Sequence, residues 1–185
     1  MPIIRLFVTK VCLVSMMTAF AGSAIAAPFG VAMGTKVSDL KVQKDLGEGL
    51  FAVLPPTTNP NLVRYYVYAT PKHGVCNVSA GSKSSFDSVL ARSLLDDLRK
   101  LLTVKYGSAK PEVDKFDVAW FDKVVGKPDF DEQASHWSGN LPDDIRRITL
   151  KLSKSSEGFS VHIKYAFDNE SSCYLWSPEN EATGL

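Results

Sequence analysis

The sequence predicts an α+β domain in which an antiparallel β-sheet of about five or six strands packs against one long amphipathic helix. Residues that alternate between apolar and polar form two groups, at 62–81 and at 144–168. Between the two groups, leucines recur every three or four residues over 84–107, which is the period of a helix. Strands on both sides of a single helix are typical of one sheet with one covering helix.

The first 26 residues have the layout of a secretory signal peptide. Arg5 and Lys10 provide positive charge, a short apolar run follows, and Ala24 and Ala26 form a small-residue cleavage pattern. The apolar run over 11–27 is shorter than the ~20 residues that span a bilayer. We therefore expect a periplasmic or secreted protein with no transmembrane segment in its mature chain. The expected organisation is a signal peptide at 1–26, a single domain at 27–176 and a flexible tail at 177–185.

Charge gives no sign of a nucleic-acid partner. The whole chain has 21 basic and 20 acidic residues, and removing Arg5 and Lys10 leaves 19 basic residues against the same 20 acidic ones. A near-neutral protein has no general attraction to polyanions. The sequence also lacks the motifs that bind cofactors, so we expect neither a cofactor nor a metal.

Two cysteines, Cys76 and Cys173, remain after the expected cleavage, because Cys12 leaves with the signal peptide. Two cysteines in an exported chain most often form a disulfide, which is the pairing we predict. The alternation around Cys76 places it on the same strand face as Val78 and Ala80, toward the core.

Two other interpretations of the cysteines stay open at this stage. One is a thiol nucleophile that works with His73, His136 or His162. The other is a metal site built from His73, Cys76 and Cys173, although a single HxxC spacing is a weak signal.

The first group of strands reads as an antiparallel meander. We expect strands at 50–54, 62–70 and 74–81, with the turn Pro71–Gly74 between the last two. In the middle strand, Val63, Tyr65, Val67 and Ala69 form the expected buried face. The opposite face then holds Arg64, Tyr66 and Tyr68.

The helix is expected to begin behind Ser84 or Ser85 as N-cap, with Asp87 in its first turn, and to end at Gly107. Its predicted core stripe consists of Phe86, Leu90, Leu94, Leu98 and Leu102, one every four residues. A second, shorter helix over 111–126 is compatible with the spacing of Val113, Phe116, Trp120 and Val124.

A short strand is expected at 135–138, and the last group of strands reads as a hairpin with one buried and one wet face. Ile148, Leu150 and Leu152 belong to the buried face. His162 falls on the wet face, where it would be an ordinary surface residue.

Short glycine and aromatic motifs resemble those of a group of small exported bacterial proteins. The motifs are FG-x-x-MG over 29–34, HGVCNVSAGSK over 73–83, and YG at 106–107 after the long helix. The resemblance implies export and an α+β domain, and it implies no established activity. The glycines indicate backbone positions that need tight turns before a short first helix.

The function that the sequence favours is a soluble, exported binding or interaction protein of the bacterial envelope, with a protein as its partner. Tyrosine and arginine supply much of the energy at interfaces. The candidate partner-binding residues are Arg64, Tyr66, Tyr68, His136 and Trp137. The alternatives are an envelope hydrolase with an unmarked active site and a passive structural protein. The sequence favours a protein that is not an enzyme, because no catalytic constellation is marked.

Overall fold

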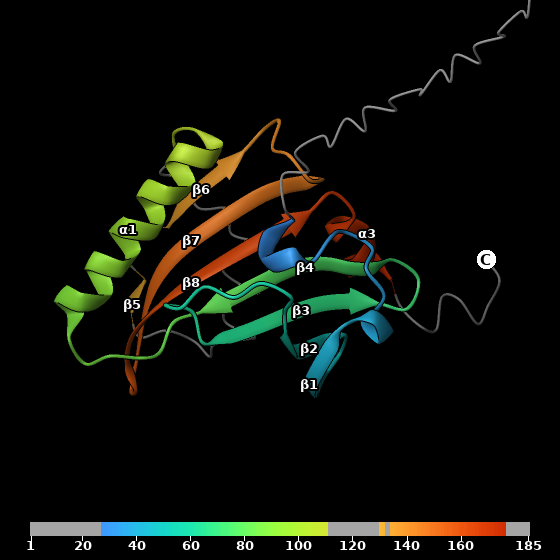
Figure 1. Ribbon diagram of the computed structural model, residues 1–185, viewed down its shortest axis with the longest axis horizontal. Helices are drawn as coiled ribbons and strands as arrows, with labels where there is room; N and C mark the ends of the chain where they lie inside the picture. Colours follow the sequence, from blue (N-terminus) through green and yellow to red (C-terminus); the bar gives the residue numbers. More distant parts are fainter. Residues whose placement is uncertain (1–26, 111–129, 132–133, 177–185) are drawn as a thin grey trace, which may run out of the picture.

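The computed structural model describes residues 27–110, 130–131 and 134–176 as one curved antiparallel sheet with a long helix on one side (Figure 1). In the described residues the sheet has eight strands, two more than the upper end of the expected range. The long helix has 19 residues. The elements are η1 Pro28–Gly30, η2 Val37–Asp39, β1 Lys41–Gly47, β2 Leu50–Leu54, β3 Arg64–Thr70, β4 Gly74–Gly81, α1 Ser88–Tyr106, β5 Phe130–Asp131, β6 Ser135–Ser138, β7 Ile145–Ser155, β8 Gly158–Phe167 and α3 Glu170–Leu175.

Two groups of strands meet in the middle of this sheet. The order is β1-β2-β3-β4-β8-β7-β5, and β6 also pairs with β7. The joint is the pairing of β4 with β8, where Asn77 lies opposite Ala166. Strand β6 confirms the expected strand at 135–138. The sequence did not predict β1, because every residue of that strand is exposed and none alternates toward a core.

One face of the sheet forms the core. Val67, Val78, Tyr165 and Ile148 lie side by side across four strands and belong to one core, and α1 packs on this core at β7 and β8. The residues of α1 that complete this core are Ala91, Leu95, Leu98 and Leu102. This stripe follows the 3.6-residue period of the helix, whereas the predicted stripe with a residue every fourth position drifts around the helix. Leu90 is consequently exposed, and Phe86 is exposed because it lies before the N-cap Asp87 and outside the helix, both contrary to the prediction.

The helix begins later than expected. Asp87 is the N-cap, and its carboxylate accepts hydrogen bonds from the amides of Val89 (2.8 Å) and Leu90 (3.2 Å). Ser85 instead accepts a hydrogen bond from the Asp87 amide. Gly107 ends the helix as predicted, with φ of 85° and its amide bonded to the Thr103 carbonyl.

The opposite face of the sheet is polar, and on β4, β7 and β8 it is buried rather than wet. The prediction of a wet face was wrong for the hairpin β7–β8, where polar residues alternate with the core residues yet are shielded from water. These buried polar residues include Arg147, Thr149, Lys151, Ser153, Ser160, His162 and Lys164. His162 is therefore not an ordinary surface residue.

A β-bulge in β4 turns Cys76 to this polar face. Tyr68 pairs with Asn77 and Ala69 pairs with Val75, so Cys76 is an extra residue without a partner across the β3–β4 ladder. Cys76 is bonded to Cys173 of α3, with 6.4 Å between their Cα atoms. The disulfide is thus confirmed and Cys76 is buried, but it does not share a face with Val78, because the bulge interrupts the alternation.

The glycine motif near the start of the domain makes a tight packing contact. Phe29 lies edge-on against Tyr65 and Tyr165, with ring centroids 5.1 Å and 5.7 Å apart. The amide of Gly34 donates to the Val75 carbonyl (2.9 Å), which brings Gly34 against Gly74 with no room for a side chain on Gly74. The motif therefore docks the first segment of the domain on the sheet.

Several expectations lie outside the described residues: the signal peptide at 1–26, the second helix over 111–126 and the tail at 177–185. Among the helices that the structure describes, none has the length and hydrophobicity needed to cross a membrane.

Candidate functional site

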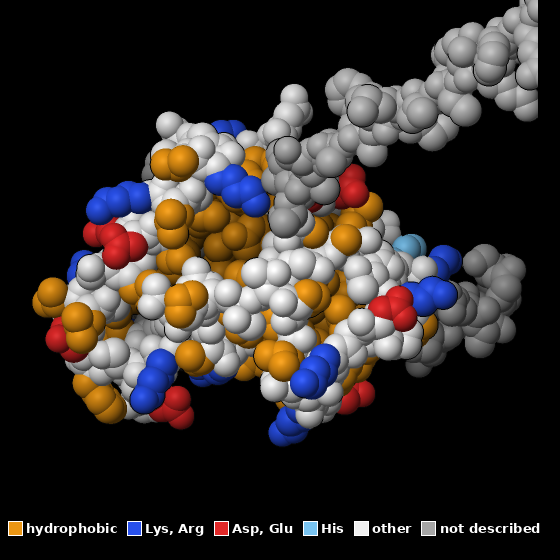
Figure 2. All heavy atoms as spheres, viewed as in Figure 1, with side chains coloured by type: hydrophobic (Ala, Val, Ile, Leu, Met, Phe, Trp, Pro, Cys, Tyr) orange, Lys and Arg blue, Asp and Glu red, His pale blue; other side chains and the backbone are white. Residues whose placement is uncertain are grey.

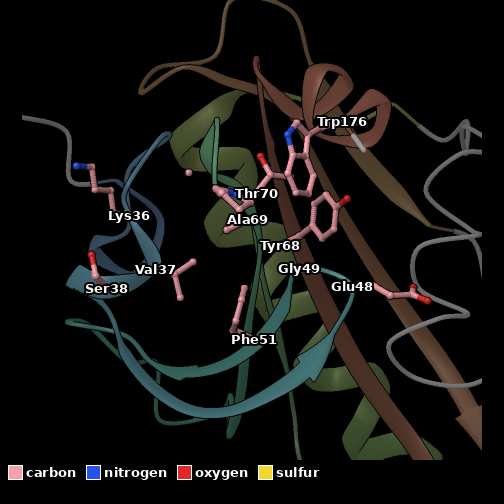
Figure 3. Close-up of a pocket in the computed structure, with 12 residues that line it drawn as sticks. Lys36, Val37, Ser38, Glu48, Gly49, Phe51, Tyr68, Ala69, Thr70 and Trp176 are labelled. Atoms are coloured by element: carbon pink, nitrogen blue, oxygen red, sulfur yellow. The ribbon is translucent and has the colours of Figure 1, made fainter. Parts of the chain in front are cut away.

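One candidate site is a cavity of about 760 Å³ with aromatic walls (Figure 3). We call it the aromatic cavity. It lies among η2, the β1–β2 turn, β2, β3 and the residue that follows α3. Its lining consists of Lys36, Val37, Ser38, Glu48, Gly49, Phe51, Tyr68, Ala69, Thr70, Pro71, Gly74 and Trp176. A cavity of this size with mostly apolar walls has the properties of a small-molecule site.

Tyr68 forms one wall of the aromatic cavity and is held by α3. Its ring stacks on Tyr174, with centroids 5.1 Å apart and an interplanar angle of 18°. Its hydroxyl donates a long hydrogen bond of 3.5 Å to the Cys173 carbonyl. Burial, and secondly the nearby Glu170 carboxylate, raise the pKa of Tyr68, so the hydroxyl stays protonated at neutral pH.

Trp176 forms the wall next to Tyr68, as Figure 3 shows. Its Nε1 is buried, and in the part of the chain that the structure describes no atom accepts a hydrogen bond from it. A buried donor without an acceptor costs about 1–3 kcal/mol. A ligand with an acceptor oxygen or nitrogen at that point would recover this free energy.

The polar face of the sheet positions both aromatic walls through α3. Glu170 Oε1 lies 2.8 Å from Lys164 Nζ and accepts a hydrogen bond of 3.2 Å from Asn77 Nδ2. The disulfide then ties Cys173 to β4. The ion pair of Glu170 and the disulfide of Cys173 thus anchor α3 at two points. This fixes Trp176, which follows α3, and Tyr174, on which Tyr68 stacks.

A second, smaller concavity opens between α1 and the first segment of the domain. We call it the apolar groove; its volume is about 290 Å³, and a hollow lined with hydrophobic side chains is visible beside α1 in Figure 2. Leu98, Leu101 and Leu102 of α1 form one wall, and Ile163 and Tyr165 belong to the sheet side. Burial raises the pKa of Tyr165, so this floor is uncharged.

The buried polar face contains a serine–histidine contact that resembles part of a catalytic arrangement. Ser160 Oγ lies 2.8 Å from His162 Nε2, and both residues are buried. Burial, then the charges of Arg64 and Lys151, lower the pKa of His162 to about 3. The His162 imidazole is therefore neutral at physiological pH, and solvent does not reach it. We interpret the Ser160–His162 contact as part of the packing of this face. Within 27–110, 130–131 and 134–176, no three His, Cys, Asp or Glu residues are grouped to hold a metal.

The structure separates the five residues that the sequence suggested for partner binding. Tyr68 lies at the aromatic cavity, Tyr66 is half-buried on the same face of β3, and Arg64 Nη2 donates to the Ser82 carbonyl at 2.8 Å. His136 is half-buried in β6. Trp137 is buried, and its Nε1 donates to the Gly107 carbonyl at 2.7 Å, so it joins α1 to β6 and is not available on the surface.

The sequence does not predict most of the aromatic cavity. Its pattern places Phe51 only in a short strand, and it marks neither Val37 nor Trp176 as a site residue. A tryptophan three residues after a bonded cysteine is the one signal that could have pointed to this wall.

Comparison with known proteins gives no further lead: no protein-family model, no curated protein and no solved structure matches this chain.

Proposed function

We propose that this protein is a disulfide-stabilised binding protein that is exported from the cytoplasm, and that the aromatic cavity is its ligand site. The observation that carries the proposal is the cavity itself, with Phe51, Tyr68 and Trp176 around one apolar space. The bond between Cys76 and Cys173 supports an oxidising compartment, the periplasm or the extracellular space. The FG-x-x-MG motif supports the same location.

The walls indicate the chemistry of the ligand. Aromatic and aliphatic side chains favour a flat or flexible apolar body, which gains about 25 cal/mol per Å² of apolar area removed from water. The unpartnered Trp176 Nε1 favours one hydrogen-bond acceptor on that body. Lys36 and Glu48 belong to the same lining and favour a ligand end that is polar and solvated. The ligand class is therefore an amphiphile with an apolar body and one acceptor group.

The test uses 8-anilino-1-naphthalenesulfonate, a fluorescent amphiphile, with the protein purified from the envelope without detergent. Phe51→Ala and Tyr68→Ala, each of which removes an aromatic wall, should each weaken probe binding at least tenfold. Tyr66→Ala is the matched control, because Tyr66 is half-buried on the same face of β3 and does not line the cavity.

Leu101→Ala is a second control, since Leu101 lines the apolar groove and does not line the aromatic cavity. Equal binding by wild type and both cavity variants would refute the ligand site. Loss of binding in Leu101→Ala alone would assign the probe to the groove and would refute the proposal as well.

The partner-binding hypothesis from the sequence is tested with the same variants. Crosslinking in intact cells followed by capture should recover a protein partner less efficiently with Tyr66→Ala if the face of β3 is an interface. Unchanged capture would place any protein partner elsewhere. Fractionation of the cells tests export, because a cytoplasmic protein with reduced cysteines would contradict the proposal.

A further inference from the structure

Helix α1 carries a second apolar stripe that faces away from the sheet. We call it the outer stripe; its residues are 63% to 88% exposed, and hydrophobic side chains are visible on the surface around α1 in Figure 2. The outer stripe consists of Val89, Leu90, Leu101 and Val104 of α1, together with Phe86, which lies just before the N-cap Asp87. Leu90 and Leu101 are eleven residues apart, about three helical turns, so they lie on one face, roughly 140° around the helix from buried Leu95.

We propose that two copies of this chain pair through α1, antiparallel and with two-fold symmetry, so that Leu90 of each copy packs on Leu101 of the other. In a two-fold interface, if residue i contacts residue j, then j contacts i. The outer stripe satisfies this condition. With Leu90 on Leu101, the numbers of facing helical residues add to about 191. Val104 of each copy then lies near the N-terminal end of the other helix, which Phe86 precedes.

The polar residues of the same face also match in this register. The residue numbers of Ser93 and Asp97 also add to about 191, so these two residues face each other across the interface. The serine hydroxyl of each copy can therefore donate to the Asp97 carboxylate of the other. Lys100 Nζ lies 3.7 Å from Asp97 Oδ1 within each helix and partly neutralises the two carboxylates near the symmetry axis. The centre of the interface is therefore paired rather than repulsive.

The ends of the helix are complementary in charge. Asp87 caps the N-terminus and Lys105 lies in the last turn, and their numbers add to about 192. An antiparallel pair brings the acid of each copy toward the base of the other, and it also aligns opposite ends of the two helix dipoles. A parallel pair would place like charges together at both ends. Charge thus favours a second copy in the antiparallel direction.

The size of the stripe sets the strength of the pairing. A helix of 19 residues is about 28 Å long and about 10 Å wide, so one copy contributes roughly 300 Å². Stable interfaces bury about 800 Å² per partner. The apolar groove adjoins the outer stripe at Leu101 and adds area, but the dimer remains weak and depends on concentration.

Sedimentation velocity over a wide range of protein concentration tests the proposal. Wild type should shift from monomer to dimer in the upper micromolar range, and Leu101→Asp should raise the dissociation constant at least tenfold. Val63→Asp is the matched control, because Val63 is 58% exposed and lies outside α1. A wild type that stays monomeric at millimolar concentration, or a Leu101→Asp protein that dimerises as well as wild type, would overturn the proposal.

Cysteine crosslinking tests the register. A mixture of Leu90→Cys and Leu101→Cys proteins should form a disulfide-linked heterodimer, because the two positions face each other. Leu90→Cys alone should not crosslink, since its two copies would be about 16 Å apart and a disulfide needs Cα atoms within about 7 Å. Efficient crosslinking of Leu90→Cys with itself, or none in the mixture, would overturn the antiparallel arrangement.

Discussion

Lys164 Nζ lies 2.8 Å from Glu170 Oε1, and the two side chains are only 1% and 2% exposed. Arg147 Nη2 approaches the other carboxylate oxygen at 4.0 Å, and Asn77 also donates to Glu170. A single acidic side chain of α3 thus neutralises positive charge on β7 and β8. The interaction joins the C-terminal helix to the middle of the sheet.

Removing this carboxylate should destabilise the fold strongly. Glu170→Gln leaves a buried ammonium without its counter-charge, and breaking a buried pair costs about 3–5 kcal/mol. Asp96→Asn is the control, because Asp96 forms an equally short pair with Arg99 (2.6 Å) at the surface, where such pairs contribute about 1 kcal/mol or less. Urea melts of both variants measure the difference, and equal costs would contradict the role assigned to Glu170.

Cys76 and Cys173 should be unreactive in protein purified without reductant. Thiol labelling of the unfolded, unreduced chain should find neither residue, and labelling of both would refute the bond. Replacing both by serine should cost about 2–5 kcal/mol, because the bond closes 97 residues of chain. The same variant should bind the fluorescent probe more weakly than wild type under conditions where it remains folded, since α3 holds two walls of the aromatic cavity.

His162 should make stability fall as the pH drops below about 6.5. Its pKa is about 3 in the folded protein, against 6.5 in an unfolded chain, so the unfolded state binds the proton more tightly. The loss should be small above pH 6.5, about 2 kcal/mol at pH 5, and should level off only below pH 3. Urea melts from pH 8 to pH 4 measure this slope. His162→Gln should flatten it, and an unchanged slope would assign the acid sensitivity to other groups.

Gly74→Ala should destabilise the fold more than Gly47→Ala. Both glycines have positive φ, 63° and 85°, where a side chain costs about 1–2 kcal/mol. A Cβ on Gly74 would also collide with the Gly34 backbone, while a Cβ on Gly47 would meet nothing within 4 Å. Thermal melts should therefore separate the two variants, and equal melting temperatures would show that the contact with Gly34 relaxes easily.

The sequence predicted those parts of the fold that depend on local patterns. Alternation in β3 and β8 identified the core face correctly at Tyr65, Val67, Ile163 and Tyr165, because period-two burial is encoded residue by residue. The prediction that Val63 is buried was wrong, because Val63 lies before β3 begins and is 58% exposed. The same alternation could not show that the other face is buried too. Whether Lys164 lies in water or against Glu170 depends on a helix that follows β8 in the chain.

Two other differences have equally specific causes. The bulge at Cys76 inserts one residue into the ladder and reverses the facing of that cysteine, and no local pattern marks it. Trp137 was predicted to be accessible to a partner because it lies in a polar stretch. Its indole instead donates a hydrogen bond to the Gly107 carbonyl at the end of α1. The aromatic cavity was unpredictable for the same reason, since its walls come from residues as distant as Val37 and Trp176.

The joint between β4 and β8 also constrains the order of folding. Strands β1 to β4 can pair with one another as soon as they have been synthesised. Strand β4 can pair with β8 only later, because Ala166, the partner of Asn77, follows it by 89 residues. Until then β4 presents an open edge, and an unpaired strand edge is a template for pairing with other chains. Closing such a distant pair is slow, because the entropy of a long loop is lost before the contacts form. Aggregation of the nascent chain should therefore depend on the time between these two strands more than on the stability of the finished fold.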